Sequence, residues 1–208
     1  MKVLLINGSA NKKGCTFTAL TEVANILEKQ GVTTEIIQIG NTPIRDCTGC
    51  LACKKLGNKC VYNDDIVNEV IEKAKDADGF IFGSPVYYAH PSGRILSLLD
   101  RAFYADKSAF AYKPGAAVVS ARRAGTTASI DVLNKYFNLA QMPIVSSQYW
   151  NMVHGSKPED VLQDAEGMQI MRTLGNNMAW IIKCIEAGKN TGIIRPEAEE
   201  PVRTNFIR

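Results

Sequence analysis

The sequence has no apolar run long enough to cross a bilayer, only two histidines, and no large excess of either charge. A net charge of +3 on 208 residues is too small to indicate binding to nucleic acid or to a membrane surface. The amino-terminal segment MKVLLINGSA carries one lysine and four strongly apolar residues in a row, too few for the core of a signal peptide. These shortages predict a cytoplasmic protein without membrane or nucleic-acid partners.

Cysteine, in contrast, is plentiful and unevenly distributed. A reducing compartment argues against a disulfide framework for the six cysteines. Four of them, Cys47, Cys50, Cys53 and Cys60, follow the spacing C-x2-C-x2-C-x6-C. Structural zinc usually takes two C-x2-C pairs that lie a dozen or more residues apart, so this compact spacing fits a [4Fe–4S] cluster better. The alternative that they are buried or oxidisable thiols stays open, and Cys184 is expected in the core.

Apolar runs alternate with amphipathic segments along the chain. The run at 3–6 is apolar throughout, as in a central parallel strand, and further strands are predicted at 33–40 and 143–151 and within 79–88 and 115–125, where a strand runs into a loop. Helical spacing predicts helices at 15–31, 64–78, 93–104, 126–142 and 162–187. The pattern predicts a doubly wound α/β fold with a five-stranded parallel sheet and helices on both faces. We expect one domain over 1–190, and a tail over 191–208 that is either disordered or packed on a neighbouring subunit.

Three loops that follow predicted strands carry distinctive residues, and ligands of such sheets bind beyond the carboxyl ends of the strands. The first loop, GSANKKGCT, enters a helix and offers the backbone N–H groups of a phosphate cradle. It matches neither G-x-G-x-x-G nor G-x-x-x-x-G-K-[ST], which disfavours a Rossmann dehydrogenase or an ATPase.

The second and third loops add an aromatic surface and positive charge. Tyr87 and Tyr88 in GSPVYYAHPSG could stack on a planar ligand, and Pro85 stiffens the turn before them. SARRAGTT places Arg122 and Arg123 beside a glycine. A phosphate cradle, an aromatic platform and a cationic loop at one edge together indicate FMN.

The same residues carry a family resemblance. GSANKKGCT resembles the G-S-P-R-x-x-G-N-T phosphate loop, and GSPVYYAHPSGRILSLLDRAF is similar to the G-[ST]-P-[VI]-Y…K-x-[FL]-[LI]-D-R signature, of flavodoxin-fold NAD(P)H-dependent FMN reductases. The branch it resembles includes the iron–sulfur flavoproteins, whose compact cysteine pattern it shares. The resemblance runs from Lys2 to about Gly155. It implies a flavodoxin-like strand order 2-1-3-4-5, bound FMN, and a homodimer or homotetramer whose sites are completed by a neighbouring subunit.

By position, the resemblance implies three groups of FMN contacts. The phosphate would be contacted by Ser9, Lys12, Cys15 and Thr16. The ribityl chain and isoalloxazine ring would be contacted by Pro85, Val86, Tyr87 and Tyr88. The pyrimidine edge would be flanked by Ser120, Arg122, Arg123 and Gly125. Three residues depart from the family pattern, namely Ala10 for proline, Asn11 for arginine and Cys15 for asparagine.

The function we expect is an FMN-dependent oxidoreductase. NAD(P)H would bind transiently, and a quinone, a free flavin or a carrier protein would take the electrons. One alternative is an electron-transfer iron–sulfur flavoprotein with FMN and [4Fe–4S], fed by ferredoxin. Another is a flavin-binding module without enzymatic activity. No residue is expected to be catalytic, since the cofactor carries the chemistry and neither His90 nor His154 has a partner acid at a recognisable spacing.

Overall fold

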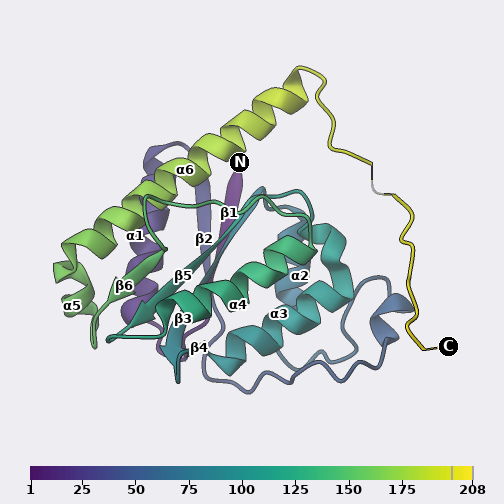
Figure 1. The fold of residues 1–208 in the computed structure, drawn as a ribbon, viewed down its shortest axis with the longest axis horizontal. Helices are drawn as coiled ribbons and strands as arrows, with labels where there is room; N and C mark the ends of the chain where they lie inside the picture. Colours follow the sequence, from purple (N-terminus) through teal and green to yellow (C-terminus); the bar gives the residue numbers. More distant parts are fainter. Residues whose placement is uncertain (198, 208) are drawn as a thin grey trace.

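The computed structural model describes residues 1–197 and 199–207 and shows a parallel sheet between two layers of helices (Figure 1). The sheet strands are β1 (Lys2–Asn7), β2 (Thr33–Gln38), β3 (Gly79–Tyr87), β5 (Gly115–Ala121) and β6 (Met152–His154). Their order is β2-β1-β3-β5-β6, and all neighbouring pairs in it are parallel. The short strand β4 (His90–Pro91) forms an antiparallel hairpin with the end of β3. Without this hairpin strand, the order is the predicted 2-1-3-4-5, which confirms the flavodoxin-like doubly wound fold.

The helices divide between the two faces of the sheet. One face is covered by α1 (Cys15–Lys29), α5 (Pro158–Gln163) and α6 (Ala165–Asn190). The other is covered by α2 (Val67–Lys75), α3 (Gly93–Asp106) and α4 (Thr126–Leu139). Two short 3₁₀ turns, η1 (Ala52–Lys54) and η2 (Lys107–Ala109), lie in the connections.

The apolar strand runs are explained by burial on both faces. In β1, Val3 and Leu5 pack against α1 and α6, whereas Leu4 and Ile6 belong to the core under α2 and α3. Because successive strand residues point to opposite faces, a strand covered on both sides must be apolar at every position. This burial holds the sheet rigid and leaves the loops at its carboxyl edge to carry function.

The prediction for the fifth strand is wrong in position. Residues 143–151 do not form a strand; Ile144 makes an isolated bridge to Gly115, and the chain then loops out before β6 pairs with the end of β5. Tyr149 and Trp150 in this loop are half exposed and meet edge to face, with ring centroids 4.7 Å apart. Such residues are typical of strands, but this segment lies at an edge of the sheet, where nothing pairs with its outer side.

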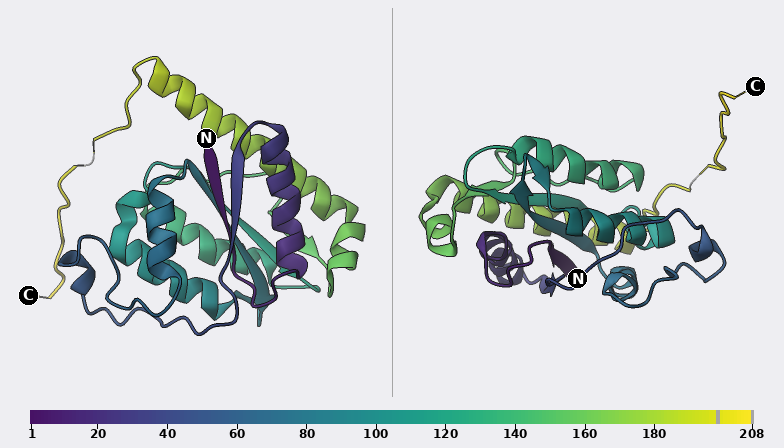
Figure 2. Two further views of the ribbon diagram at one scale, coloured as in Figure 1. Left: turned by 180° about the vertical axis from the view of Figure 1, so that it is seen from behind. Right: turned by 90° about the horizontal axis from the view of Figure 1, so that it is seen from below.

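Beyond α6 the described tail has no regular secondary structure, and Figures 1 and 2 show it running outside the two helix layers. Val202, Phe206 and Ile207 are almost fully exposed there. In the described ranges 1–197 and 199–207, no helix is both long enough and apolar enough to cross a membrane.

Candidate functional site

The carboxyl ends of β1, β3, β5 and β6 meet at one edge of the sheet. In register, Asn7 pairs with Gly83, Pro85 with Ser120, and Ala121 with His154. The Gly8 N–H donates to the Gly83 carbonyl at 2.8 Å, and a Cβ atom on Gly8 would lie 2.6 Å from that oxygen. Only glycine therefore allows the first and second loops to approach this closely. The three loops singled out in the sequence are brought together here.

The first loop wraps the amino-terminal end of α1. Its N-cap residue, Gly14, has no side chain to cap the helix, so the first backbone N–H groups of α1 remain available to a ligand. Ser9 is buried, and its Oγ accepts from the Asn11 N–H at 3.1 Å. Lys12 is exposed and lies beside a separate hollow lined by Gln38 and Asp65.

Thr16 and Cys15 tie the start of α1 to the neighbouring strands. The hydroxyls of Thr16 and Ser120 are hydrogen-bonded at 2.8 Å, and the Cys15 thiol donates to the Gly155 carbonyl at 3.6 Å. Burial raises the pKa of the Cys15 thiol, so it is neutral at pH 7. Four of the predicted residues, Ser9, Cys15, Thr16 and Ser120, thus surround the start of one helix.

The second loop holds its aromatic side chains out of the protein. Pro85 and Val86 are half-buried, whereas Tyr87 is largely exposed and Tyr88 fully exposed. Tyr88 has φ +50° and Ala89 has φ +59°. Both lie in the left-handed region, which residues other than Gly, Asn and Asp rarely adopt. Tyr88 and Ala89 are the two turn residues of the β3–β4 hairpin, where positive φ at both positions is typical, and this turn holds the Tyr88 ring in solvent.

The third loop closes against the second. A Cβ atom on Gly125, which has φ +91°, would lie 2.5 Å from the Cα of Ala89, so a side chain there would separate the loops. Arg122 and Arg123 belong to this third loop and are exposed. Two exposed tyrosine rings and two exposed guanidinium groups therefore lie on loops at the same edge as the start of α1.

One residue pair at this edge was not found from the sequence. The His154 ring Nε2 lies 3.2 Å from the Arg123 carbonyl oxygen, and its Nδ1 lies 3.9 Å from a carboxylate oxygen of Asp164. The His154 backbone N–H donates to the same oxygen at 2.7 Å. Asp164, at the junction of α5 and α6, therefore lies beside His154 and is hydrogen-bonded to its backbone rather than to its ring. No sequence signal marks this pair, because the two residues belong to different elements whose relative position is set by packing.

The four clustered cysteines lie on a loop between β2 and α2, packed against α3. Together with Arg101 and Tyr104 they line one small cavity. Cys50 is exposed, and the other three are half-buried. Within residues 1–197 and 199–207, no three cysteine, histidine or acidic side chains gather closely enough to hold a single metal ion. In a [4Fe–4S] cluster each thiolate binds a different iron, so its four sulfurs need not converge on one point.

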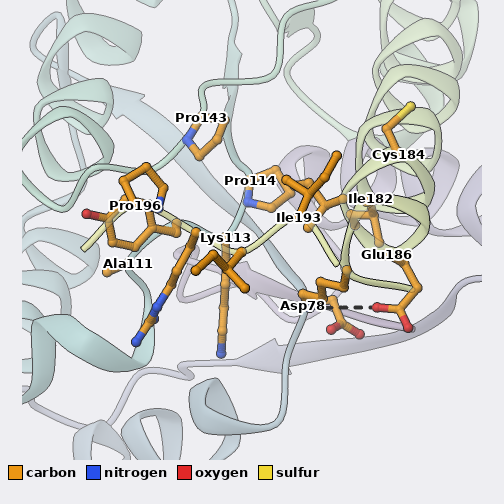
Figure 3. Close-up of a pocket in the computed structure, with 16 residues that line it drawn as sticks. Asp78, Ala111, Lys113, Pro114, Pro143, Ile182, Cys184, Glu186, Ile193 and Pro196 are labelled. Atoms are coloured by element: carbon orange, nitrogen blue, oxygen red, sulfur yellow. Dashed lines mark ion pairs between the residues drawn. The ribbon is translucent and has the colours of Figure 1, made fainter. Parts of the chain in front are cut away.

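Another cavity, of about 500 Å³, lies at the amino-terminal edge of the sheet, where the strands begin (Figure 3). It is lined by apolar residues of α6 and the tail, such as Ile182 and Ile193, with Pro114 and Lys113 before β5. Cys184 also lines it and is exposed, so the expectation of a core position for Cys184 is wrong. None of the residues predicted to contact a cofactor lies here.

A doubly wound parallel sheet with its distinctive loops at the carboxyl edge defines a flavodoxin-like α/β protein. The fold is similar to that of RosB with a bound 8-demethyl-8-formylriboflavin-5'-phosphate intermediate (TM-score 0.69, 13% identity, covering 100% of this chain and 94% of RosB). It is also similar to a flavodoxin from the domain Archaea (TM-score 0.59, 15% identity, covering 88% of this chain and 99% of that one).

Sequence comparison gives the family. Residues 1–157 match the profile of the NADPH-dependent FMN reductases, and the chain belongs to this family. It is 33% identical over 195 residues to an iron–sulfur flavoprotein of Methanocaldococcus jannaschii, covering 89% of this chain and 100% of that one. The family resemblance stated from the loops is therefore confirmed, and the protein is a flavin-dependent oxidoreductase. The alternative of a module without enzymatic activity is not retained.

Proposed function

We propose that the chain binds FMN at the carboxyl edge of its sheet and uses it to pass electrons from NAD(P)H to a quinone, a free flavin or another acceptor. The observation that carries this proposal is the convergence of the three loops on the uncapped start of α1. A phosphate group, a planar ring and a polar ring edge each find matching chemistry within that one place.

The start of α1 fits the phosphate of FMN. Backbone N–H groups and the Thr16 hydroxyl would donate to its oxygens, and the helix dipole favours a negative charge there. The neutral Cys15 thiol adds no repelling charge beside it. Cys15 would thus take the place of the family's asparagine as a weaker donor.

The second and third loops would hold and tune the ring. Tyr87 and Tyr88 offer faces for stacking, while Arg122 and Arg123 would favour the reduced, more negative form and so raise the redox potential. When bound, FMN supplies the acceptor for hydride and the donor of electrons, whereas the chain orients it and sets its potential. The exposure of this edge suits both exchange of small substrates and completion by a neighbouring subunit.

A second candidate is an electron-transfer protein in which FMN is joined by a [4Fe–4S] cluster and electrons come from ferredoxin. Two observations favour it: Cys47, Cys50, Cys53 and Cys60 line one cavity, and the relative in M. jannaschii is named an iron–sulfur flavoprotein. The backbone N–H of Ala52 is the main cause of a lowered pKa at Cys50, which favours the thiolate that iron binds.

Anaerobic purification, an absorbance spectrum, and assays of iron and acid-labile sulfide test both candidates. Bound flavin with about four irons per chain supports the cluster. Oxidation of NADH or NADPH in steady state supports the first candidate, and reduction by ferredoxin alone supports the second. A protein that binds no FMN would contradict both.

A matched pair of variants locates the cluster. Cys53→Ser should lose the iron while Cys184→Ser, at an exposed cysteine outside the loop, should keep it. Equal iron in both variants would show that the metal is not held by the clustered cysteines.

A further inference from the structure

We propose that Arg101 tunes the reduction potential of the iron–sulfur cluster through a hydrogen bond to the sulfur of Cys60. This inference rests on the cluster of the second candidate function, and it concerns the chain's own residues around it. Arg101 belongs to the LLDRAF part of the family signature, yet it lies on α3, away from the three loops at the carboxyl edge.

The guanidinium of Arg101 is oriented by contacts on all sides. Its Nε–H donates to Cys60 Sγ at 3.2 Å, and Nη2 donates to the Tyr62 carbonyl at 3.0 Å. Nη1 donates to the Asp65 carboxylate and, at 3.3 Å, to the Arg45 carbonyl. Because the guanidinium is planar and rigid, these acceptors together fix its orientation, and the Nε–H points at the Cys60 sulfur.

Cys60 is held equally firmly from its backbone side. The Asn68 side chain accepts from the Cys60 N–H at 2.8 Å and donates to the Cys60 carbonyl at 3.0 Å. Of the four cysteines, Cys50 is in contrast exposed. Cys60 is thus the fixed end of the cysteine loop, and its contact with Arg101 is part of the fold rather than a chance approach.

Stability alone does not explain a charged residue at this position. Arg101 is 1% exposed and pairs with Asp65, whose side chain is also buried. Removing two charges from water offsets most of the attraction between them, and apolar residues of similar size often stabilise a core equally well. The oriented cation therefore points to a role toward the sulfur that it contacts.

Hydrogen bonds to cluster sulfurs are one of the factors that set the potential of an iron–sulfur centre. A cation that donates to a ligand thiolate stabilises the form carrying the additional electron, and so makes the cluster easier to reduce. Arg101 is a positioning and tuning residue in this sense, and it takes no part in the chemistry at FMN.

The test is the cluster midpoint potential, measured by an anaerobic redox titration followed by electron paramagnetic resonance. Arg101→Lys keeps a positive charge opposite Asp65 but loses the Nε–H that reaches the sulfur, and Arg101→Gln loses the charge as well. The potential should fall in Arg101→Lys and fall further in Arg101→Gln. Arg45→Gln is the control, because Arg45 carries the same charge and lies near the cysteine loop, but its side chain is exposed and pairs with Asp64.

Melting temperatures identify any variant that fails to fold, in which case Arg101→Lys carries the test. Unchanged potentials in folded Arg101 variants, or an equal fall in Arg45→Gln, would overturn the role of Arg101 while leaving the cluster in place. Wild-type protein without iron and sulfide would overturn the cluster itself, and the role of Arg101 with it.

Discussion

Tyr88 combines two unfavourable features at one residue. Its backbone lies in the left-handed region, and its ring is fully exposed to water. Strain of this kind costs on the order of 1 kcal/mol or more and persists where the surrounding structure imposes it. The β3–β4 hairpin imposes it here, because Tyr87 pairs with His90 and leaves Tyr88 and Ala89 as a two-residue turn with positive φ at both positions. The hairpin therefore sets the backbone of Tyr88, while its exposed ring adds no packing to the fold.

If the two tyrosines serve binding rather than stability, the double variant Tyr87→Ala, Tyr88→Gly should change FMN affinity but not the melting temperature. Glycine adopts the positive φ without strain, so the double variant should melt no lower than the wild type. It should bind FMN roughly ten- to a hundred-fold more weakly, since two aromatic contacts are worth about 1–3 kcal/mol. Fluorescence titration with FMN measures the affinity.

Tyr149→Ala is the control, since Tyr149 is similarly exposed but lies in the loop before β6. Equal FMN affinity in the double variant and in Tyr149→Ala would remove both tyrosines from the site.

At the scale of elements, one carboxylate connects three segments. Glu35 on β2 contacts Lys2 on β1 at 2.6 Å and Lys73 on α2 at 2.5 Å. Hydrogen bonds from Lys2 first, and then from Lys73, lower the pKa of Glu35 below its usual value of 4.5. The edge strand β2 is therefore held to β1 and α2 by ion pairs as well as by its backbone hydrogen bonds to β1.

A lowered pKa in the folded state means that this contribution is complete above about pH 4.5 and is lost as pH falls through the folded value. Glu35→Gln should consequently reduce stability at pH 7 by about 0.5–1 kcal/mol, and the difference from wild type should shrink toward pH 3. Urea unfolding at several pH values measures this. A difference that is constant with pH would show that the carboxylate charge is not the cause.

At the scale of the whole molecule, the described part of the tail exposes apolar side chains. Val202, Phe206 and Ile207 are between 85% and 96% exposed in the single chain. Complete burial of such a side chain is worth about 1.5–3 kcal/mol, so their exposure favours association. We infer that the tail packs on a neighbouring copy of the chain.

If the tail packs in this way, the wild type should sediment as an oligomer, and replacing Val202, Phe206 and Ile207 together by serine should shift it toward a smaller species. Sedimentation velocity measures the mass, and Thr204→Ala in the same segment is the control. A triple variant that sediments like the wild type would show that the tail does not hold the assembly together.

The alternating elements and the three distinctive loops can be predicted from the sequence alone. Strands that are buried on both faces must be apolar throughout, and loops that bind phosphate and flavin need glycine, hydroxyl and aromatic residues at fixed places. Such local requirements are visible in β1, β3 and β5 without any knowledge of their partners. The edge strand β6 was misplaced because an edge is covered less completely, so its composition constrains its position less.

Only the tertiary structure brought His154 to Asp164 and Arg101 to Cys60. Each pair joins two segments whose relative position depends on the packing of the whole sheet and its helices. Contacts of this kind have no local signature, since a hydrogen bond between distant residues constrains their position in space and leaves their separation along the chain free.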